Sequence, residues 1–225
     1  MRYGSSVGSR WKILIAVGLA VTVLDQWTKL LAIKHLTPGF QQARAAAQRT
    51  GSPGATVEVG FGQELQYFYG SVREPCRKAM ATCPTVPVID GFWNFRYVEN
   101  PGAAWGFLAG ASEAVRVPFF FAVSVAAIAF IFFFFRKLSD QQHLLIMALS
   151  LVFGGAIGNF IDRLHLTYVI DFIDWYAGVH HWPTFNVADA AISTGVGLLV
   201  VDMIFAKDPS RAPRPASAET ADSKG

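Results

Sequence analysis

The sequence is poor in the residues and patterns from which metal, disulfide and nucleotide sites are built. It has two cysteines, Cys76 and Cys83, in 225 residues, and they form neither a CxxC pair nor a Cys/His zinc spacing. HExxH, P-loop and GxGxxG patterns do not occur. His180 and His181 are adjacent, so their side chains point apart on a regular element and make a poor metal site with Asp174. We therefore expect no metal and no cofactor.

Charged residues are also scarce. They make up 16% of the chain, against about 25% in an ordinary soluble domain, whereas 52% is hydrophobic. The formal net charge of +3 is small and spread along the chain, which argues against nucleic acid as a partner. These values predict a membrane protein.

Four runs are long and apolar enough to cross a bilayer, which takes roughly 20 residues each. They cover Ile13 to about Ile33, Val117–Phe135, Leu144 to about Ile161, and about Val187 to Ala206. No run repeats another, so a transporter built from inverted repeats is not visible. The sequence predicts an all-α membrane protein, a four-transmembrane-helix bundle.

The first run has an alternative interpretation as a cleaved signal peptide, because basic residues precede it. However, no convincing small-x-small cleavage site follows, and Asp25 and Lys29 lie within continuing apolar sequence. A retained span is favoured. Basic residues flank the start of the first run, the end of the second and the end of the fourth, so we expect both termini in the cytoplasm. Regions 34–114 and 162–186 then lie outside.

The long outer region 34–114 has strand-like composition in TVEVGF, LQYFY and PVIDGFWNFRYVE, and Asp90-Gly91 is a turn signal. We expect a small extracytoplasmic β element resting on the membrane, interrupted by an insert at about 38–84. Cys76 and Cys83 lie in this insert; a disulfide and two free thiols are both open. We expect residues 1–12 to be a cytoplasmic N-terminus, 13–206 the membrane domain and 207–225 a disordered cytoplasmic tail.

The predicted topology brings polar side chains together near the outer membrane face. Most have a structural explanation: Asp25 and Lys29 are spaced as an ion pair within a helix, and Asn186 is placed to cap the fourth helix. Arg163 is suited either to reach the headgroups or to bind a carboxylate or phosphate. Asp202, at the inner end, is the exception. The outer set comprises Asp25, Lys29, Asn100, Asn159, Arg163, Asp171, Asp174, Asn186 and Asp189.

Two acids in this set are harder to explain as structural. Asp171 stands between large apolar residues in VIDF, and Asp189 follows FNVA at the membrane edge. An ionised carboxylate in apolar surroundings is unfavourable unless it is paired or hydrogen-bonded. Two neighbouring carboxylates can share a proton, so that one accepts a proton from water and the other donates one to a carbonyl oxygen. Spacing alone places the two acids at one depth and does not establish contact.

The residues also resemble a known family, the lipoprotein signal peptidases or signal peptidase II. The matching stretches are DQWTK at 25–29, VENPGAAWGF at 98–107, GGAIGNFIDR at 154–163, VIDF at 169–172 and FNVAD at 185–189. Each motif is weak alone, but all five occur in order and in the same relation to four spans. The resemblance covers roughly residues 11–206. The insert and the tail exceed the usual family length but interrupt no motif.

The resemblance implies which residues carry the chemistry. The family's catalytic aspartates fall on Asp171 and Asp189, while Asp162 and Asp174 become supporting or structural residues. The positions that match substrate-binding or supporting residues are Asp25, Lys29, Asn100, Gly102, Ala104, Asn159, Arg163 and Asn186.

The resemblance further implies a monomeric aspartic endopeptidase at the periplasmic face of a bacterial inner membrane, among membrane lipids. Its substrate is a prolipoprotein cut before a diacylglyceryl-modified cysteine. From the residues alone, two other classes stay open. A transporter or proton channel would use the acids to bind cations, and a structural subunit would use them as caps and ion pairs. An intramembrane protease of the GxGD type has no support, because that pattern does not occur.

Overall fold

The computed structural model describes residues 8–37, 60–69, 84–102, 108 and 110–205. Four helices dominate it: α1 (Ser9–Leu36), α4 (Glu113–Phe135), α5 (His143–Leu166) and α6 (Val187–Phe205). All four are long and apolar enough to cross a membrane, as the sequence predicted. The third span is longer than expected, because α5 continues to Leu166. Asp162 and Arg163 therefore lie on the last turns of a helix and not in an outer loop.

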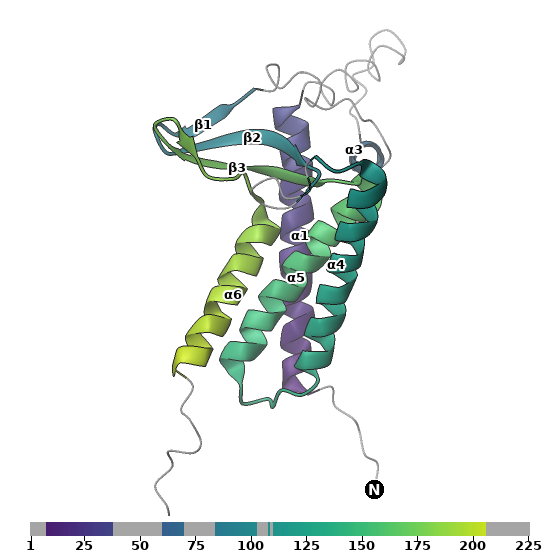
Figure 1. Cartoon of the computed structure of the whole chain (residues 1–225), viewed down its shortest axis with the longest axis vertical. Helices are drawn as coiled ribbons and strands as arrows, with labels where there is room; N and C mark the ends of the chain where they lie inside the picture. Colours follow the sequence, from purple (N-terminus) through teal and green to yellow (C-terminus); the bar gives the residue numbers. More distant parts are fainter. Residues whose placement is uncertain (1–7, 38–59, 70–83, 103–107, 109, 206–225) are drawn as a thin grey trace, which may run out of the picture.

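Helix α5 lies at the centre of the bundle, with α1, α4 and α6 packed against it (Figure 1). Two glycines of α5 make this packing close enough to bring the functional segments together. A Cβ atom on Gly155 would lie 2.5 Å from the carbonyl oxygen of Ala188 on α6, and one on Gly158 would lie 2.5 Å from Oδ2 of Asp25 on α1. Small residues at such contacts allow helix backbones to approach one another.

A four-stranded antiparallel sheet lies across one end of the bundle (Figure 1), in the order β1 (Val86–Ile89), β2 (Trp93–Asn100), β3 (Val169–Ala177), β4 (His180–His181). The turn predicted at Asp90-Gly91 is confirmed: it joins β1 to β2, and Gly91 takes the positive φ of +80° that favours glycine. Strands β3 and β4 come from the segment between the third and fourth spans. The sheet therefore joins two regions far apart in the sequence.

One strand prediction was wrong. LQYFY belongs to a helix, α3 (Phe61–Tyr69), and not to a strand. Its buried or half-buried side chains, Leu65, Phe68 and Tyr69, follow the i, i+3, i+4 spacing of a helix face and pack against the core below the sheet. Most of TVEVGF, most of the insert, both cysteines and the tail from residue 206 lie outside the described residues.

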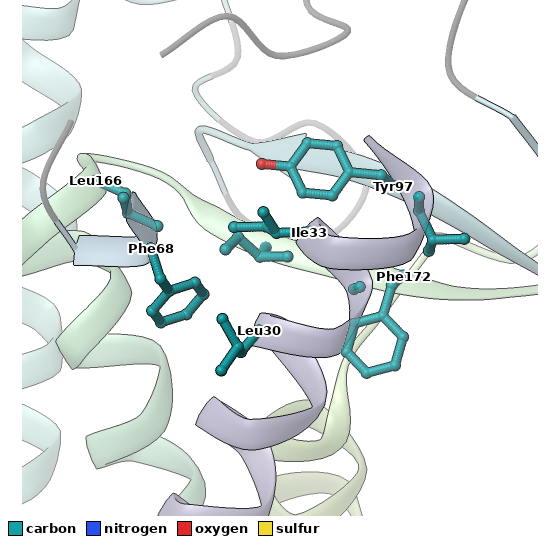
Figure 2. Packing of buried hydrophobic residues seen from close by; sticks show 9 residues of the cluster. Leu30, Ile33, Phe68, Tyr97, Leu166 and Phe172 are labelled. Carbon is teal, nitrogen blue, oxygen red and sulfur yellow. The ribbon is translucent and has the colours of Figure 1, made fainter. Parts of the chain in front are cut away.

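A hydrophobic cluster fixes the sheet to the bundle. Figure 2 shows Leu30 and Ile33 of α1, Phe68 of α3, Tyr97 of β2, Leu166 of α5 and Phe172 of β3 packed together. A second cluster, which includes Leu14, Phe135 and Ile146, lies at the opposite end of the bundle. The beginning of α1 and the end of α6 also lie at that opposite end (Figure 1), which places them on one side of the bundle.

Candidate active site

The predicted site residues meet where the sheet crosses the helices. Hydrogen bonds and ion pairs connect seven of them directly: Asp25, Lys29, Asn100, Asn159, Asp171, Asn186 and Asp189. Gly102 and Arg163 are attached to this network through Asn100 and Asn159. Ala104 lies outside the residues that the structure describes.

Asp171 is held in the middle of the sheet by two amide groups. It lies in β3 with 1% of its surface exposed. The side-chain amide of Asn100, at the end of the neighbouring strand β2, donates to Oδ2 at 2.9 Å. The side-chain amide of Asn186 donates to Oδ1 at 2.8 Å. Each carboxylate oxygen thus has a donor from a different part of the chain.

Asp189 lies in the first turn of α6, where a carboxylate is favoured by the free backbone N–H groups. It accepts a hydrogen bond from the backbone N–H of Asn186 at 3.2 Å, and Asn186 Oδ1 accepts one from the N–H of Asp189 at 2.9 Å. The predicted cap at Asn186 is therefore confirmed. The side-chain amide of Asn159 donates to the other oxygen of Asp189 at 2.8 Å.

Asn186 joins the two acids, because its side chain bonds to Asp171 while its backbone bonds to Asp189. Its position is fixed by the preceding residue, Phe185, which forms backbone hydrogen bonds to Phe172 and Ile173 of β3 at 2.8–3.0 Å. The chain leaves β3, turns at Gly178 and returns alongside the strand. Two acids that are distant in sequence are thereby held against the same asparagine.

Burial raises the pKa of Asp171 well above its usual range, and the negative charge of Asp189 adds to this effect. The hydrogen bond from Asn100 and the positive charge of Lys29 act in the opposite direction, as does the hydrogen bond from Asn186. A raised pKa favours the protonated form. Asp171 is thus suited to hold a proton that an ordinary aspartate would have lost.

A pocket of about 740 Å³ opens beside the acids, between α4 and α6 and below the sheet. Asp189 lines this pocket together with Asn100, Asn159 and Arg163, and the remaining wall is largely apolar. The Arg163 guanidinium lies 5.4 Å from the centre of the Phe120 ring and donates to the backbone oxygen of Asn159 at 3.3 Å. One acid therefore faces the pocket while the other is buried, and a cation lies on the same wall.

The described residues contain no group of three or more histidine, cysteine, aspartate or glutamate side chains placed to hold a metal ion. Asp174, which the sequence placed among the outer acids, lies in a separate cluster on the sheet. It contacts Arg96 at 3.2 Å and His181 Nδ1 at 2.9 Å. These contacts connect β2, β3 and β4.

Comparison with known proteins decides between the three classes that the sequence left open: a peptidase, a transporter or proton channel, and a structural subunit. A family model described as signal peptidase II matches residues 72–205. The lipoprotein signal peptidase of Anaeromyxobacter sp. (strain Fw109-5) is 43% identical over 86% of this chain and 85% of its own length. The chain belongs to the signal peptidase II family. It is therefore a peptidase, as the five motifs predicted.

A second relative and one solved structure agree. The lipoprotein signal peptidase of Geobacter sulfurreducens is 54% identical over 56% of this chain and 78% of its own length. A solved structure described as a bacterial membrane enzyme superposes with a TM-score of 0.58 at 26% identity, covering 90% of this chain and 93% of that one. The four-helix membrane architecture with a small sheet is thus shared.

Contacts around Lys29 extend beyond those anticipated from the sequence. Lys29 and Asp25 form the predicted ion pair, at 2.8 Å, but Lys29 also contacts Asp162 at 2.8 Å. Asp162 further accepts a hydrogen bond from Gln26 at 2.8 Å. All three ionic side chains are at most 1% exposed. The GNFIDR motif drew attention to Asp162, but its ionic partner lies on a different helix, far earlier in the chain.

Proposed function

We propose that this chain removes the signal peptide from lipoprotein precursors by activating water between Asp171 and Asp189. Membership in the signal peptidase II family supports the substrate class. The observation that carries the mechanism is the asymmetric pair: a buried acid with a raised pKa, and a second acid on the wall of a pocket, both held by Asn186.

The difference in environment supports a separate role for each acid. Asp171 carries the shared proton, and Asp189 is the ionised partner that faces the pocket. Asp189 takes a proton from water while the water oxygen attacks the carbonyl carbon of the scissile bond. Asp171 gives its proton to the carbonyl oxygen. This division requires neither a metal nor a covalent intermediate.

The tetrahedral intermediate then breaks down, and the two acids exchange protons with it in the reverse sense. Asp189 passes the proton that it took from water to the leaving nitrogen, and the C–N bond breaks. One hydroxyl of the tetrahedral carbon returns a proton to Asp171 as the new carboxyl group forms. Each acid ends in the protonation state in which it began, so the pair is ready for another turnover.

The surroundings of the pair fit a substrate that arrives within the bilayer. The pocket opens between α4 and α6, both of which have many exposed apolar side chains. The signal helix enters between these spans, and the acyl chains of a diacylglyceryl-cysteine stay against the lipid-facing surface. Arg163 and Asn100, on the pocket wall, bind polar groups of the segment that is cut.

We further propose the orientation predicted from the flanking basic residues. The sheet and the acids lie at the periplasmic face of a bacterial inner membrane, and both termini are cytoplasmic. The chain works as a monomer. Ala104 is part of the substrate site.

The decisive experiment uses purified protein and a synthetic diacylglyceryl-modified precursor, with the products identified by mass spectrometry. Asp171→Asn and Asp189→Asn should each reduce cleavage by about 10,000-fold, because an amide cannot accept or donate the proton. Asp202→Asn, near the far end of α6, is the matched control and should cleave normally. A folded Asp171→Asn protein that retains a tenth of normal activity would exclude the mechanism.

A further inference from the structure

A buried lysine contacts three oxygen atoms immediately beside the two acids. The Lys29 ammonium lies 2.8 Å from Oδ2 of Asp25, 2.8 Å from Oδ2 of Asp162 and 3.0 Å from Oδ1 of Asn159. Lys29 and Asp25 are fully buried. An ammonium group has three N–H donors, so its hydrogen-bonding capacity is completely used.

These contacts fix the orientation of the Asn159 amide. Its oxygen accepts from Lys29 at 3.0 Å and from the side-chain amide of Asn186 at 3.1 Å. Its nitrogen therefore faces Asp189, to which it donates at 2.8 Å. A flipped amide would turn an NH₂ group toward the ammonium and an oxygen toward the carboxylate, and both contacts would be repulsive.

The two carboxylates bound to Lys29 hold the backbone beside each acid. Asp25 Oδ1 accepts a hydrogen bond from the N–H of Ala188 at 2.9 Å, and Asp162 Oδ2 accepts one from the N–H of Ile170 at 3.1 Å. Ala188 directly precedes Asp189, and Ile170 directly precedes Asp171. Through these two carboxylates, one ammonium is connected to the backbone beside both acids, on α6 and on β3.

We propose that Lys29, together with Asp25 and Asp162, is a positioning residue that sets the relative placement of Asp171 and Asp189. This inference rests on the proposed function of the two acids. Lys29 acts through Asn159 and through the backbone at Ile170 and Ala188, and it does not touch the substrate. Its effect should therefore fall on the rate of the chemical step and not on substrate binding.

The main test is Lys29→Met, which keeps an unbranched side chain of similar length and removes the ammonium. We expect kcat to fall by about 100-fold, as for a misplaced catalytic group, with KM unchanged. Lys34→Met is the matched control, since it makes the same substitution on the same helix and breaks a separate ion pair with Glu64 at 2.6 Å. The control should retain the normal kcat.

A pH profile separates positioning from a purely structural role. The charges that act on Asp171 come from Lys29 on α1 and Asp189 on α6, and Arg163 on α5 also interacts with it. Because Lys29 lowers the pKa of Asp171, removing it should raise that pKa further. The alkaline limb of the kcat profile of Lys29→Met should therefore move to higher pH.

The double variant Lys29→Met/Asp25→Asn covers the case in which the single variant does not fold. It removes one positive and one negative charge, so the net charge of the cluster is unchanged, and the introduced amide oxygen keeps an acceptor for the N–H of Ala188. We expect it to show the same loss of kcat with a smaller pH shift. A lower melting temperature alone, with normal kcat and pH profile per folded molecule in either variant, would overturn the proposal.

Failure of the positioning role can be distinguished from failure of the proposed function by comparing Lys29→Met with Asp171→Asn. If Asp171→Asn is inactive while Lys29→Met cleaves normally, only the positioning role is refuted. If Asp171→Asn cleaves normally, the mechanism itself is refuted whatever Lys29→Met does.

Discussion

Two pairs of carboxylates lie at the sheet end of this bundle, and they are stabilised in different ways. Asp25 and Asp162 share one ammonium at 2.8 Å each. Asp171 and Asp189 instead receive hydrogen bonds from amide groups of asparagines. An adjacent cation favours the ionised form strongly, whereas neutral amides leave more than one protonation state accessible. The first pair is therefore suited to structure and the second to proton transfer.

The largest effect should come from breaking the cation-bound pair. Asp162→Ala leaves Lys29 with one carboxylate, and it also removes the acceptors for Gln26 and Ile170. Removing one partner of a buried ion pair costs about 3–5 kcal/mol. We expect the free energy of unfolding in detergent micelles to fall by that amount. Asp171→Asn should cause no comparable loss, and equal losses in the two variants would refute the distinction between the pairs.

A smaller effect should follow from loosening the amide-bound pair. Asn100→Ala removes a donor to the protonated Asp171, and a hydrogen bond between neutral groups is worth about 0.5–1.5 kcal/mol. We expect kcat/KM to fall by up to roughly 10-fold. Because the Asn100 bond lowers the pKa of Asp171, its loss raises that pKa, so the alkaline limb moves to higher pH. If the alkaline limb of the pH profile of kcat/KM stayed at the same pH as in the unaltered protein, this would count against Asp171 as the proton carrier.

The smallest effect should appear where the same ionic contact is only partly buried. Lys34 and Glu64 join α1 to α3 at 2.6 Å, with 27% and 12% of their side chains exposed. Pairs with solvent access contribute about 1 kcal/mol or less. Lys34→Met should therefore lower the free energy of unfolding by no more than that. A loss as large as that of Asp162→Ala would show that burial is not what separates the two contacts.

Local sequence patterns were sufficient to predict the secondary-structure elements that depend on residues close together in the chain. The four spans follow from apolar runs of sufficient length, and the β1–β2 hairpin follows from strand-forming residues on both sides of Asp90-Gly91. LQYFY was misassigned because its aromatic composition resembles a strand, although Leu65, Phe68 and Tyr69 also fit one helix face. Composition and periodicity disagreed there, and periodicity was the better guide.

The site was predictable only in part, because it depends on contacts between distant segments. Topology placed the acids at one end of the bundle, and the five motifs singled out Asp171 and Asp189 among them. The pairing of β3 with β2 and the contact between Lys29 and Asp162 have no local signal. The strand pairing joins two segments about 70 residues apart, and the ionic contact depends on how α1 packs against α5, which single-sequence patterns do not encode. The catalytic roles themselves stay predictions.

The unequal attachment of α4 has a mechanical consequence. Far from the sheet, Phe132 and Phe135 of α4 pack on Trp11 of α1, with ring centres 5.6 and 5.0 Å apart. Near the sheet, α4 rests on α5 through Phe121 and Phe160, and it forms one wall of the pocket. Both acids lie on other elements. If α4 pivoted about the end that packs on Trp11, the entrance to the pocket would change in width and the acids would stay in place. Admission of a bulky molecule and the bond-breaking geometry are thus separately adjustable.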